Sequence, residues 1–366
     1  MSADVADPAL DQSPLDRERL HKKGVFLKWC ALVSPLLGIA GSFLTLLLIV
    51  TLTRNASFDD TWKAIFIVLP TAIGCGIWAV LYPRSKRCFA LSAQETLAID
   101  LRSPVVYLRS FKDDRDITVR NFKQFFPLWR LLHLIKLWGT VLNLFDTRTE
   151  EEVLAKVLSQ VGPVVGIGRP GEKLPQLGAA RVYVGDDEWQ KTVHDFLSQA
   201  GLVVLRLGKT PGFFWEVEQS AGRMDPTRLI LLVPLSRRKY RDFCDRAATH
   251  FSKGLPAYNC SRFRRLFGAN LLGDLRAMIY FEPDWTPVFV DLARVRSPWR
   301  HKLRMAGRRD LLNAYDWALQ PVYRQLGVEW KAPSFGPARI GVVLFKSIPV
   351  LFLIGIAVLI AVESHR

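Results

Sequence analysis

The chain has 366 residues, a length that suits two or three structural units. Its five cysteines form no C-x-x-C pair, so we expect neither a disulfide framework nor a zinc site, and the pattern suits a reducing compartment. The formal net charge is +16, but the basic residues lie largely beside apolar segments, so anionic lipid rather than nucleic acid is the expected counterpart.

The N-terminal part of the chain predicts a tail followed by a transmembrane hairpin. Residues 1–22 are expected to form a disordered cytoplasmic tail, because they are largely polar. Residues 23–83 hold two apolar segments, Trp29–Thr53 and Ala64–Tyr82, each long enough to cross a bilayer. Basic residues precede the first segment and follow the second, so the positive-inside rule places both ends of the hairpin in the cytoplasm.

A third apolar segment, Ile340–Val362, predicts a last transmembrane helix. Its one charged residue, Lys346, lies near the cytoplasmic end, where a long side chain reaches the interface. We therefore expect a multi-pass protein of the inner (plasma) membrane, with the soluble domain, residues 95–330, in the cytoplasm. A transporter is disfavoured, because a single ionisable residue within three spans offers no pathway.

Residues 95–330 alternate between short apolar segments and segments with helical spacing, which predicts an α/β domain with a parallel sheet and helices on both faces. Five strands are expected, at 104–108, 163–167, 202–205, 229–233 and 277–281. Residues 288–290 offer a continuation of the fifth strand. The helices are expected at 150–161, 186–200, 308–326 and after Thr210.

One apolar insert, residues 125–145, does not fit this alternation. Its basic and polar residues recur near helical spacing on one narrow face. Such a helix can lie in the membrane plane or pack on the domain, and the sequence leaves both open.

The segment Leu202–Ser220 carries the main candidate for chemistry. A buried strand, a Gly-Lys-Thr-Pro-Gly turn and a helix starting on Phe213 would place Glu216 in the first helical turn. That position lies past the carboxyl end of a strand, where open α/β sheets bind ligands. The alternative is that Glu216 compensates the helix dipole and Trp215 packs in the core.

Further polar residues follow the first two predicted strands, at the same edge of the sheet. They are Arg109, Ser110, Phe111 and Asp113 after the first strand, and Arg169 in a loop rich in glycine and proline after the second. No Walker, G-x-G-x-x-G, H-E-x-x-H or G-x-S-x-G pattern is present, so metal and triad hydrolase chemistry receive little support.

Taken together, these segments resemble a Toll/interleukin receptor (TIR)-like domain. Val105–Asp114 is similar to the opening box of that family, Ile167–Pro175 to the loop after its second strand, and Leu202–Glu218 to its third box. The resemblance covers about residues 104–290 and implies a flavodoxin-like fold with a parallel five-stranded sheet. The chain also resembles membrane-anchored bacterial proteins of unassigned role.

The resemblance implies that Glu216, counted from Thr210-Pro211, is the catalytic glutamate of a domain that cleaves NAD as its substrate. Phe111 and Trp215 would line the pocket, and Arg109 or Arg169 would meet the pyrophosphate, with Ser110 and Asp113 nearby; no metal is implied. Self-association through the domain is a further expectation. Many family members are scaffolds without turnover, so a non-catalytic adaptor at the membrane stays open beside a signalling or defence enzyme.

Overall fold

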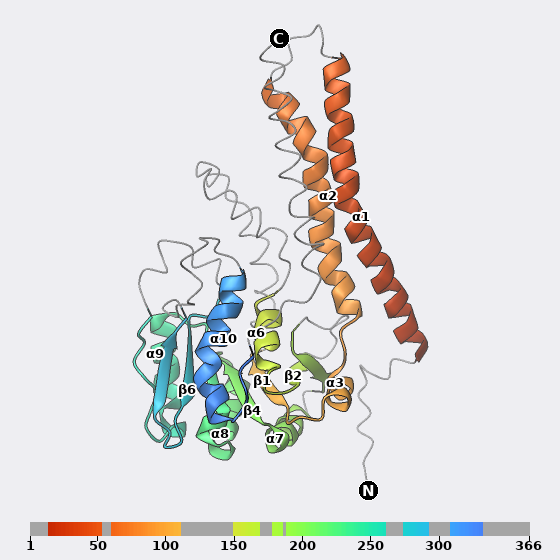
Figure 1. Ribbon diagram of the computed structural model, residues 1–366. Coiled ribbons are helices and arrows are strands. Elements are labelled where there is room, and N and C mark those ends of the chain that lie inside the picture. The colour runs from red at the N-terminus through yellow and green to blue at the C-terminus, as the bar shows by residue number, and fades with distance from the viewer. Residues whose placement is uncertain are drawn as a thin grey trace.

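The computed structural model describes residues 14–52, 60–110, 149–168, 178–185, 188–260, 274–292 and 308–331. Two long helices, α1 (Pro14–Leu52) and α2 (Asp60–Cys88), form a hairpin that projects from an α/β domain (Figure 1). Helix α1 starts at Pro14, so residues 14–22, expected to be disordered, belong to a helix.

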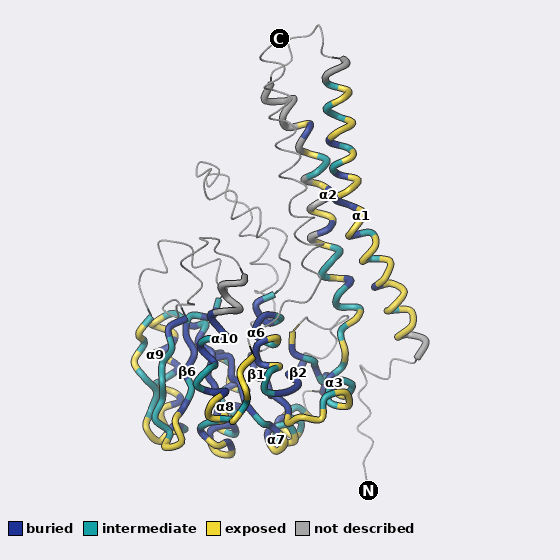
Figure 2. Tube along the Cα trace, viewed as in Figure 1, coloured by how far each residue is buried: buried dark blue, intermediate teal, exposed yellow. Residues whose placement is uncertain are grey.

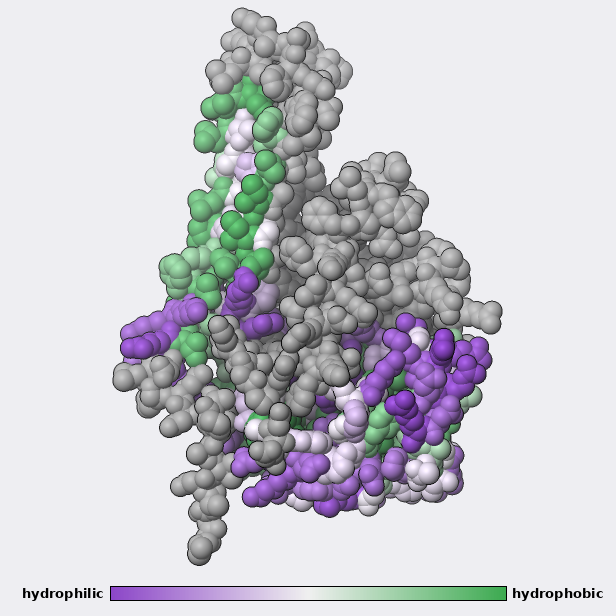
Figure 3. Space-filling view, turned by 180° about the vertical axis from the view of Figure 1, so that it is seen from behind, coloured by the Kyte–Doolittle hydropathy of each residue, from purple (hydrophilic) through white to green (hydrophobic). Residues whose placement is uncertain are grey.

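Helix α1 is long and apolar enough to cross a membrane, over Arg17–Ile49. Its most apolar window is 22 % buried, whereas the core helix of a soluble protein is mostly buried. Figure 3 shows the hydrophobic surface of the hairpin, to which α1 contributes exposed large side chains: Phe26, Trp29, Leu36, Leu37, Phe43, Leu44, Leu47 and Leu48. Among the described residues no second helix meets the same criteria, and the predicted third span, 340–362, lies outside them.

The two helices of the hairpin pack closely through small residues. A side chain at Gly74 would meet the backbone oxygen of Ser34, and one at Gly38 would come within 2.6 Å of the backbone oxygen of Pro70. The hydroxyl groups of Ser42 and Thr71 lie 2.7 Å apart across the interface. Close backbone approach with interhelical hydrogen bonds is typical of helix pairs in membranes.

The domain contains a seven-stranded mixed sheet in the order β3-β2-β1-β4-β5-β6-β7. The strands are β1 (Val105–Arg109), β2 (Val164–Gly168), β3 (Ala180–Tyr183), β4 (Leu202–Arg206), β5 (Leu229–Val233), β6 (Ala277–Phe281) and β7 (Pro287–Asp291). The first five are parallel, and β6 and β7 are antiparallel to their neighbours.

The prediction of five parallel strands is therefore wrong in number and direction, although an α/β domain is confirmed. Strand β3 was not predicted, and the segment at 277–281 pairs antiparallel with β5. The suggested extension at 288–290 belongs to a separate strand, β7, because a tight turn at Glu282–Thr286 reverses the chain between them. Strands joined by so short a turn can pair only in antiparallel fashion.

Helices cover both faces of the sheet (Figures 1 and 2). Helices α7 (Trp189–Gln199), α8 (Pro211–Arg223) and α9 (Arg237–Ala247) pack on one face, and α6 (Glu150–Leu158) and α10 (Arg308–Gln325) on the other. The remaining elements are α3 (Ala93–Ile99), beside β3, and two 3₁₀ turns, η3 (Pro226–Arg228) and η4 (Ala248–His250). Strands β1, β2, β4 and β5 are buried along their whole length, which fits their apolar sequences, although β1 and β4 each end in a buried arginine.

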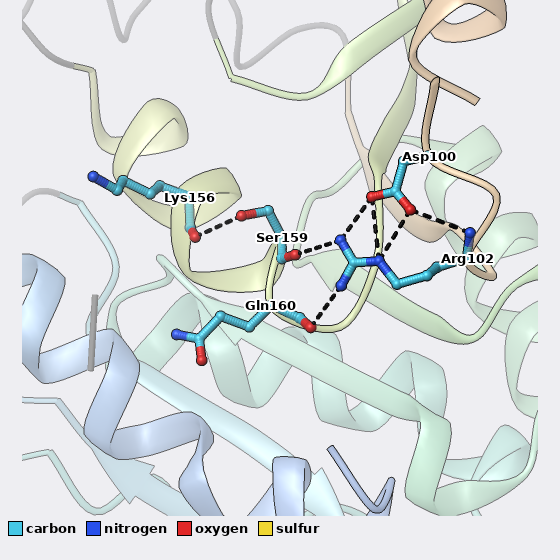
Figure 4. Close-up of polar contacts among 5 residues, drawn as sticks. All are labelled: Asp100, Arg102, Lys156, Ser159 and Gln160. Carbon is cyan, nitrogen blue, oxygen red and sulfur yellow. Dashed lines mark hydrogen bonds and ion pairs between the residues drawn. The ribbon is translucent and has the colours of Figure 1, made fainter. Parts of the chain in front are cut away.

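Helix α6 is held at both ends by polar side chains. At its start, Thr149 and Glu152 form a reciprocal capping box. Past its end, the Arg102 guanidinium donates to the backbone oxygens of Ser159 and Gln160, both at 3.0 Å, while Asp100 pairs with the same cation (Figure 4). The helix stops at Leu158, three residues before the predicted end, because its terminal carbonyl groups are satisfied there.

The hairpin contacts the domain at two ion pairs. Lys86, in the last turn of α2, lies 3.2 Å from Glu152 in the first turn of α6, and Arg17 of α1 pairs with Glu95 of α3. Because α6 runs antiparallel to the strand that follows it, its first turn marks the carboxyl edge of the parallel strands. That edge therefore lies beside the base of the hairpin.

Candidate functional site

Helix α8 starts earlier than the sequence suggested, which moves Glu216 along it. Pro211 is the first helical residue, and the Thr210 hydroxyl caps the helix by accepting from the Phe213 amide at 3.4 Å. A threonine cap followed by proline is a strong start signal, and it overrides the expected start at Phe213. Glu216 therefore lies in the second turn, not the first, and helix-dipole compensation in the first turn does not explain it.

Glu216 faces the core of the domain. It belongs to the buried stripe of α8, together with Phe213, Val217, Ser220 and Ala221. The residue is 6 % exposed, and among the described residues its Oε2 atom and the Ser220 Oγ atom have no hydrogen-bond partner. Burial raises the pKa of Glu216 to about 8, so the carboxyl group is mostly protonated at neutral pH.

Trp215 lies in an aromatic cluster between α7 and α8. Its ring centroid is 4.8 Å from that of Trp189 and 5.2 Å from that of His194, both in edge-on geometry. All three rings are half-buried. Because α7 and α8 both start at the carboxyl edge, Trp189 and Trp215 lie toward that edge, on the same face of the sheet as Glu216.

Arg109 lies on the opposite face of the sheet from α8. Side chains alternate along β1, and Arg109 follows Val105 and Tyr107, which pack against α6 and α10. Its Nη1 atom is 2.6 Å from Oε2 of Glu151, and the two side chains are 4 % and 8 % exposed. Arg181 of β3 contacts the same carboxylate at 2.9 Å.

Glu151 is ionised by this pair of cations. Burial by itself would raise its pKa, but the guanidinium groups of Arg109 and Arg181 outweigh that effect and hold the pKa below its ordinary value. The three side chains therefore form a buried ion cluster that joins β1, β3 and α6. Because every charge in the cluster faces an opposite charge, the cluster is best explained as a structural contact.

A second buried pair joins β4 to α6. Arg206 pairs with Glu150 at 3.4 Å, and Glu150 also accepts from the Tyr315 hydroxyl at 2.6 Å and from the Leu275 amide at 3.0 Å. The Arg206 pKa is raised: burial alone would lower it, but Glu150 outweighs that effect. Sequence reasoning missed this pair, although the endings VVYLR and LVVLR of β1 and β4 are alike and align in register at Arg109 and Arg206.

The predicted site residues thus divide into three groups. Glu216 and Trp215 are adjacent on α8, and the buried Ser110 follows Leu108 by two residues, which places it toward the α8 face. Arg109 lies on the other face, paired with Glu151. The remaining candidates fall outside the described residues, so their convergence on Glu216 stays a prediction: Phe111, Asp113 and Arg169.

Comparisons with protein-family models, curated proteins and solved structures find no match to this chain. In the described part of the chain, no group of three or more His, Cys, Asp or Glu side chains could hold a metal ion. A shallow hollow lined by Leu197, Met224 and Arg228 lies at the amino ends of the strands, away from Glu216.

The geometry around Glu216 supports a defined range of chemistry. A neutral carboxyl group in an apolar setting can donate a hydrogen bond, and it ionises readily when a cation approaches. The neighbouring indole rings offer flat apolar surfaces of the kind on which aromatic ligands stack. Glu216 is thus a buried carboxyl group whose charge would change if a cation came near it.

Proposed function

We propose that this chain is a membrane-anchored protein whose TIR-like domain binds NAD, or a related nucleotide, and cleaves the bond between nicotinamide and ribose. The observation that carries the proposal is Glu216, a buried carboxyl group whose Oε2 atom has no hydrogen-bond partner in the described residues, on the helix that follows the carboxyl end of β4. A buried polar group left unsatisfied costs free energy, and such groups are retained where function requires them. Ligands of open α/β sheets bind at this edge.

The proposed chemistry uses the change in charge of Glu216. The nicotinamide ring of NAD is cationic, so its approach favours the ionised form of a carboxyl group that burial keeps neutral. The carboxylate then stabilises the oxocarbenium-like ribose as the C–N bond breaks and its electron pair leaves with nicotinamide. Water adds to the ribose carbon and gives up a proton to the Glu216 carboxylate, so that the products are nicotinamide and ADP-ribose and Glu216 returns to its neutral form.

The other predicted residues take roles consistent with their positions. Trp215 would contact the nicotinamide or adenine ring, and Phe111 would line the same pocket. Of the two arginines proposed for the pyrophosphate, Arg169 is favoured, because Arg109 already pairs with Glu151 at 2.6 Å.

The membrane anchor belongs to the same proposal. The uncharged part of α1, from Trp29 onward, is about 35 Å long at 1.5 Å per residue, enough for the hydrocarbon core of a bilayer. All five Lys and Arg residues of α1 lie in its first fifteen residues, from Arg17 to Lys28, on the side that contacts the domain. We propose that α2 returns across the inner membrane, that residues 340–362 form a third span, and that the domain is cytoplasmic.

The experiment that tests this function is nicotinamide release from NAD by the full chain in lipid nanodiscs. We expect release by the wild-type chain and by Glu218→Gln, whose exposed side chain lies two residues further along α8. Glu216→Gln should abolish release while NAD binding persists. Equal release by the two variants would contradict the role of Glu216.

A second candidate function is a non-catalytic adaptor, and the depth of Glu216 favours it. Glu216 lies five residues beyond the start of α8, about 7 Å along the helix, and is 6 % exposed. If the chain is an adaptor, no nicotinamide is released under any condition, and the domain self-associates or captures a partner at the membrane. Nicotinamide release therefore separates the two functions.

A further inference from the structure

The described contacts fix which edge of the domain faces the hairpin. Lys86 of α2 pairs with Glu152 in the first turn of α6, and Glu150 in the same turn accepts from the Leu275 amide. The next amide, that of Arg276, donates to the backbone oxygen of Val233, the last residue of β5. The carboxyl edge of the sheet thus runs from the base of the hairpin to the end of β5.

Helix α9 starts at that edge, four residues after β5 ends, and its first three residues are basic: Arg237, Arg238 and Lys239. All three are exposed, as is Arg241, while Tyr240, Phe243 and Ala247 form the buried side of the helix. Figure 3 shows hydrophilic side chains gathered on the side of the domain that holds α9, away from the hydrophobic hairpin.

This arrangement opposes a local rule of helix chemistry. The amino end of a helix carries a partial positive charge, so three consecutive cations there work against the helix itself. Ser236, at the capping position, makes no side-chain hydrogen bond to the helix. A local preference that the sequence breaks in this way is typical of a functional surface.

We propose that the first turn of α9 is a second membrane contact, which binds the anionic headgroups of the leaflet that the hairpin enters. The proposal rests on the membrane anchorage given above. It assigns two attachment points to one edge of the domain, the hairpin beside the first turn of α6 and the basic turn of α9 after β5, so that the carboxyl edge lies against the bilayer. Basic segments next to a membrane are attracted to anionic lipid, and this attraction weakens as salt is added.

The test compares the full chain in nanodiscs of phosphatidylcholine with and without phosphatidylglycerol. A fluorescent residue at the exposed Thr249, just after α9, reports energy transfer to an acceptor on the lipid headgroups. The variant is Arg237→Glu with Arg238→Glu. The control, Arg223→Glu with Arg228→Glu, makes the same charge change at exposed positions on the opposite edge. Acidic residues favour a helix start, so the variant should fold.

We expect higher energy transfer in the anionic nanodiscs, and the excess should disappear at high salt. Each Lys or Arg near an anionic surface shifts the equilibrium toward membrane contact about fivefold. Arg237→Glu with Arg238→Glu should therefore abolish the excess energy transfer in anionic nanodiscs, whereas the control variant should keep it. Equal transfer in both lipids, or equal loss in variant and control, would overturn the proposal. Alkaline extraction is measured in parallel on the full chain in liposomes of the same lipids: release of the chain into the supernatant would overturn the anchor and this inference together, whereas retention with equal transfer overturns this inference alone.

Discussion

At the scale of single residues, Glu216 makes the stability of the fold decrease as pH rises, the opposite of what most carboxyl groups do. Its pKa in the folded domain is about 8, above its value of about 4.5 in the unfolded chain. The folded state therefore binds more protons than the unfolded state between these values, and stability falls as pH rises through them. The loss is complete above about pH 8 and absent below about pH 4.5.

Replacing Glu216 with glutamine should remove this dependence. We expect Glu216→Gln to match the wild type near pH 4.5 and to be more stable at pH 8.5, by on the order of 3–5 kcal/mol. Thermal unfolding of the full chain in detergent at both pH values measures the difference. The exposed Glu218→Gln serves as the control, and a constant offset between the two proteins at both pH values would show that Glu216 is not protonated in the fold.

A second residue-scale prediction concerns the buried ion cluster. Glu151→Ala leaves the guanidinium groups of Arg109 and Arg181 buried without their shared carboxylate, which should cost about 3–5 kcal/mol of stability. Arg102→Ala removes an ion pair that is half-exposed and caps the end of α6, so a loss of about 1 kcal/mol or less is expected. Chemical denaturation measures the free energy of unfolding of both variants, and Glu151→Ala should lose more of it. A larger loss for Arg102→Ala would contradict it.

At the scale of elements, the α1–α2 hairpin offers a matched pair of glycines. Gly74→Ala would drive a methyl group into the backbone oxygen of Ser34, so it should separate the helices and lower the thermal midpoint. Gly76→Ala meets no atom within 4 Å and should raise stability slightly, because alanine favours a helix by about 1 kcal/mol over glycine. Thermal unfolding of both variants gives the sign of the change in thermal midpoint, which should be negative for Gly74→Ala and positive for Gly76→Ala. Equal changes would contradict the packing described for the hairpin.

The sequence predicted the elements whose signal is local. Four of the five parallel strands, β1, β2, β4 and β5, coincide with short apolar segments, two of which end in an arginine. Strand β3 has four residues with alternating burial, which is too short a pattern to separate from a loop. The antiparallel direction of β6 depends on where the chain re-enters the sheet, and composition does not encode that.

The residues of the candidate site could be chosen from local sequence signals, but their burial and their partners could not. Glu216 could be chosen from its place after a strand, but its depth depends on the helix start at Pro211. Arg109 has the sequence context of a ligand-binding residue, yet its partner, Glu151, comes from a helix 42 residues later in the chain. The identity of a salt-bridge partner is a property of the fold, so a single sequence does not supply it.

At the scale of the whole molecule, three observations combine into one account. The hairpin presents a hydrophobic surface, its base contacts the carboxyl edge of the sheet, and Glu216 lies on a helix that starts at that edge. In the proposed function, nucleotide chemistry thus takes place on the side of the domain nearest the membrane.

The most direct measurement of the central claim is the infrared carboxyl band of Glu216, taken as the difference between the wild-type chain and Glu216→Gln at pH 7. A carbocyclic NAD analogue, whose nicotinamide bond does not break, is then added. The account predicts a protonated-carboxyl band that disappears when the cationic analogue binds. A band that persists at saturating analogue, or a carboxylate band before it is added, would contradict the proposal that Glu216 is the group NAD meets.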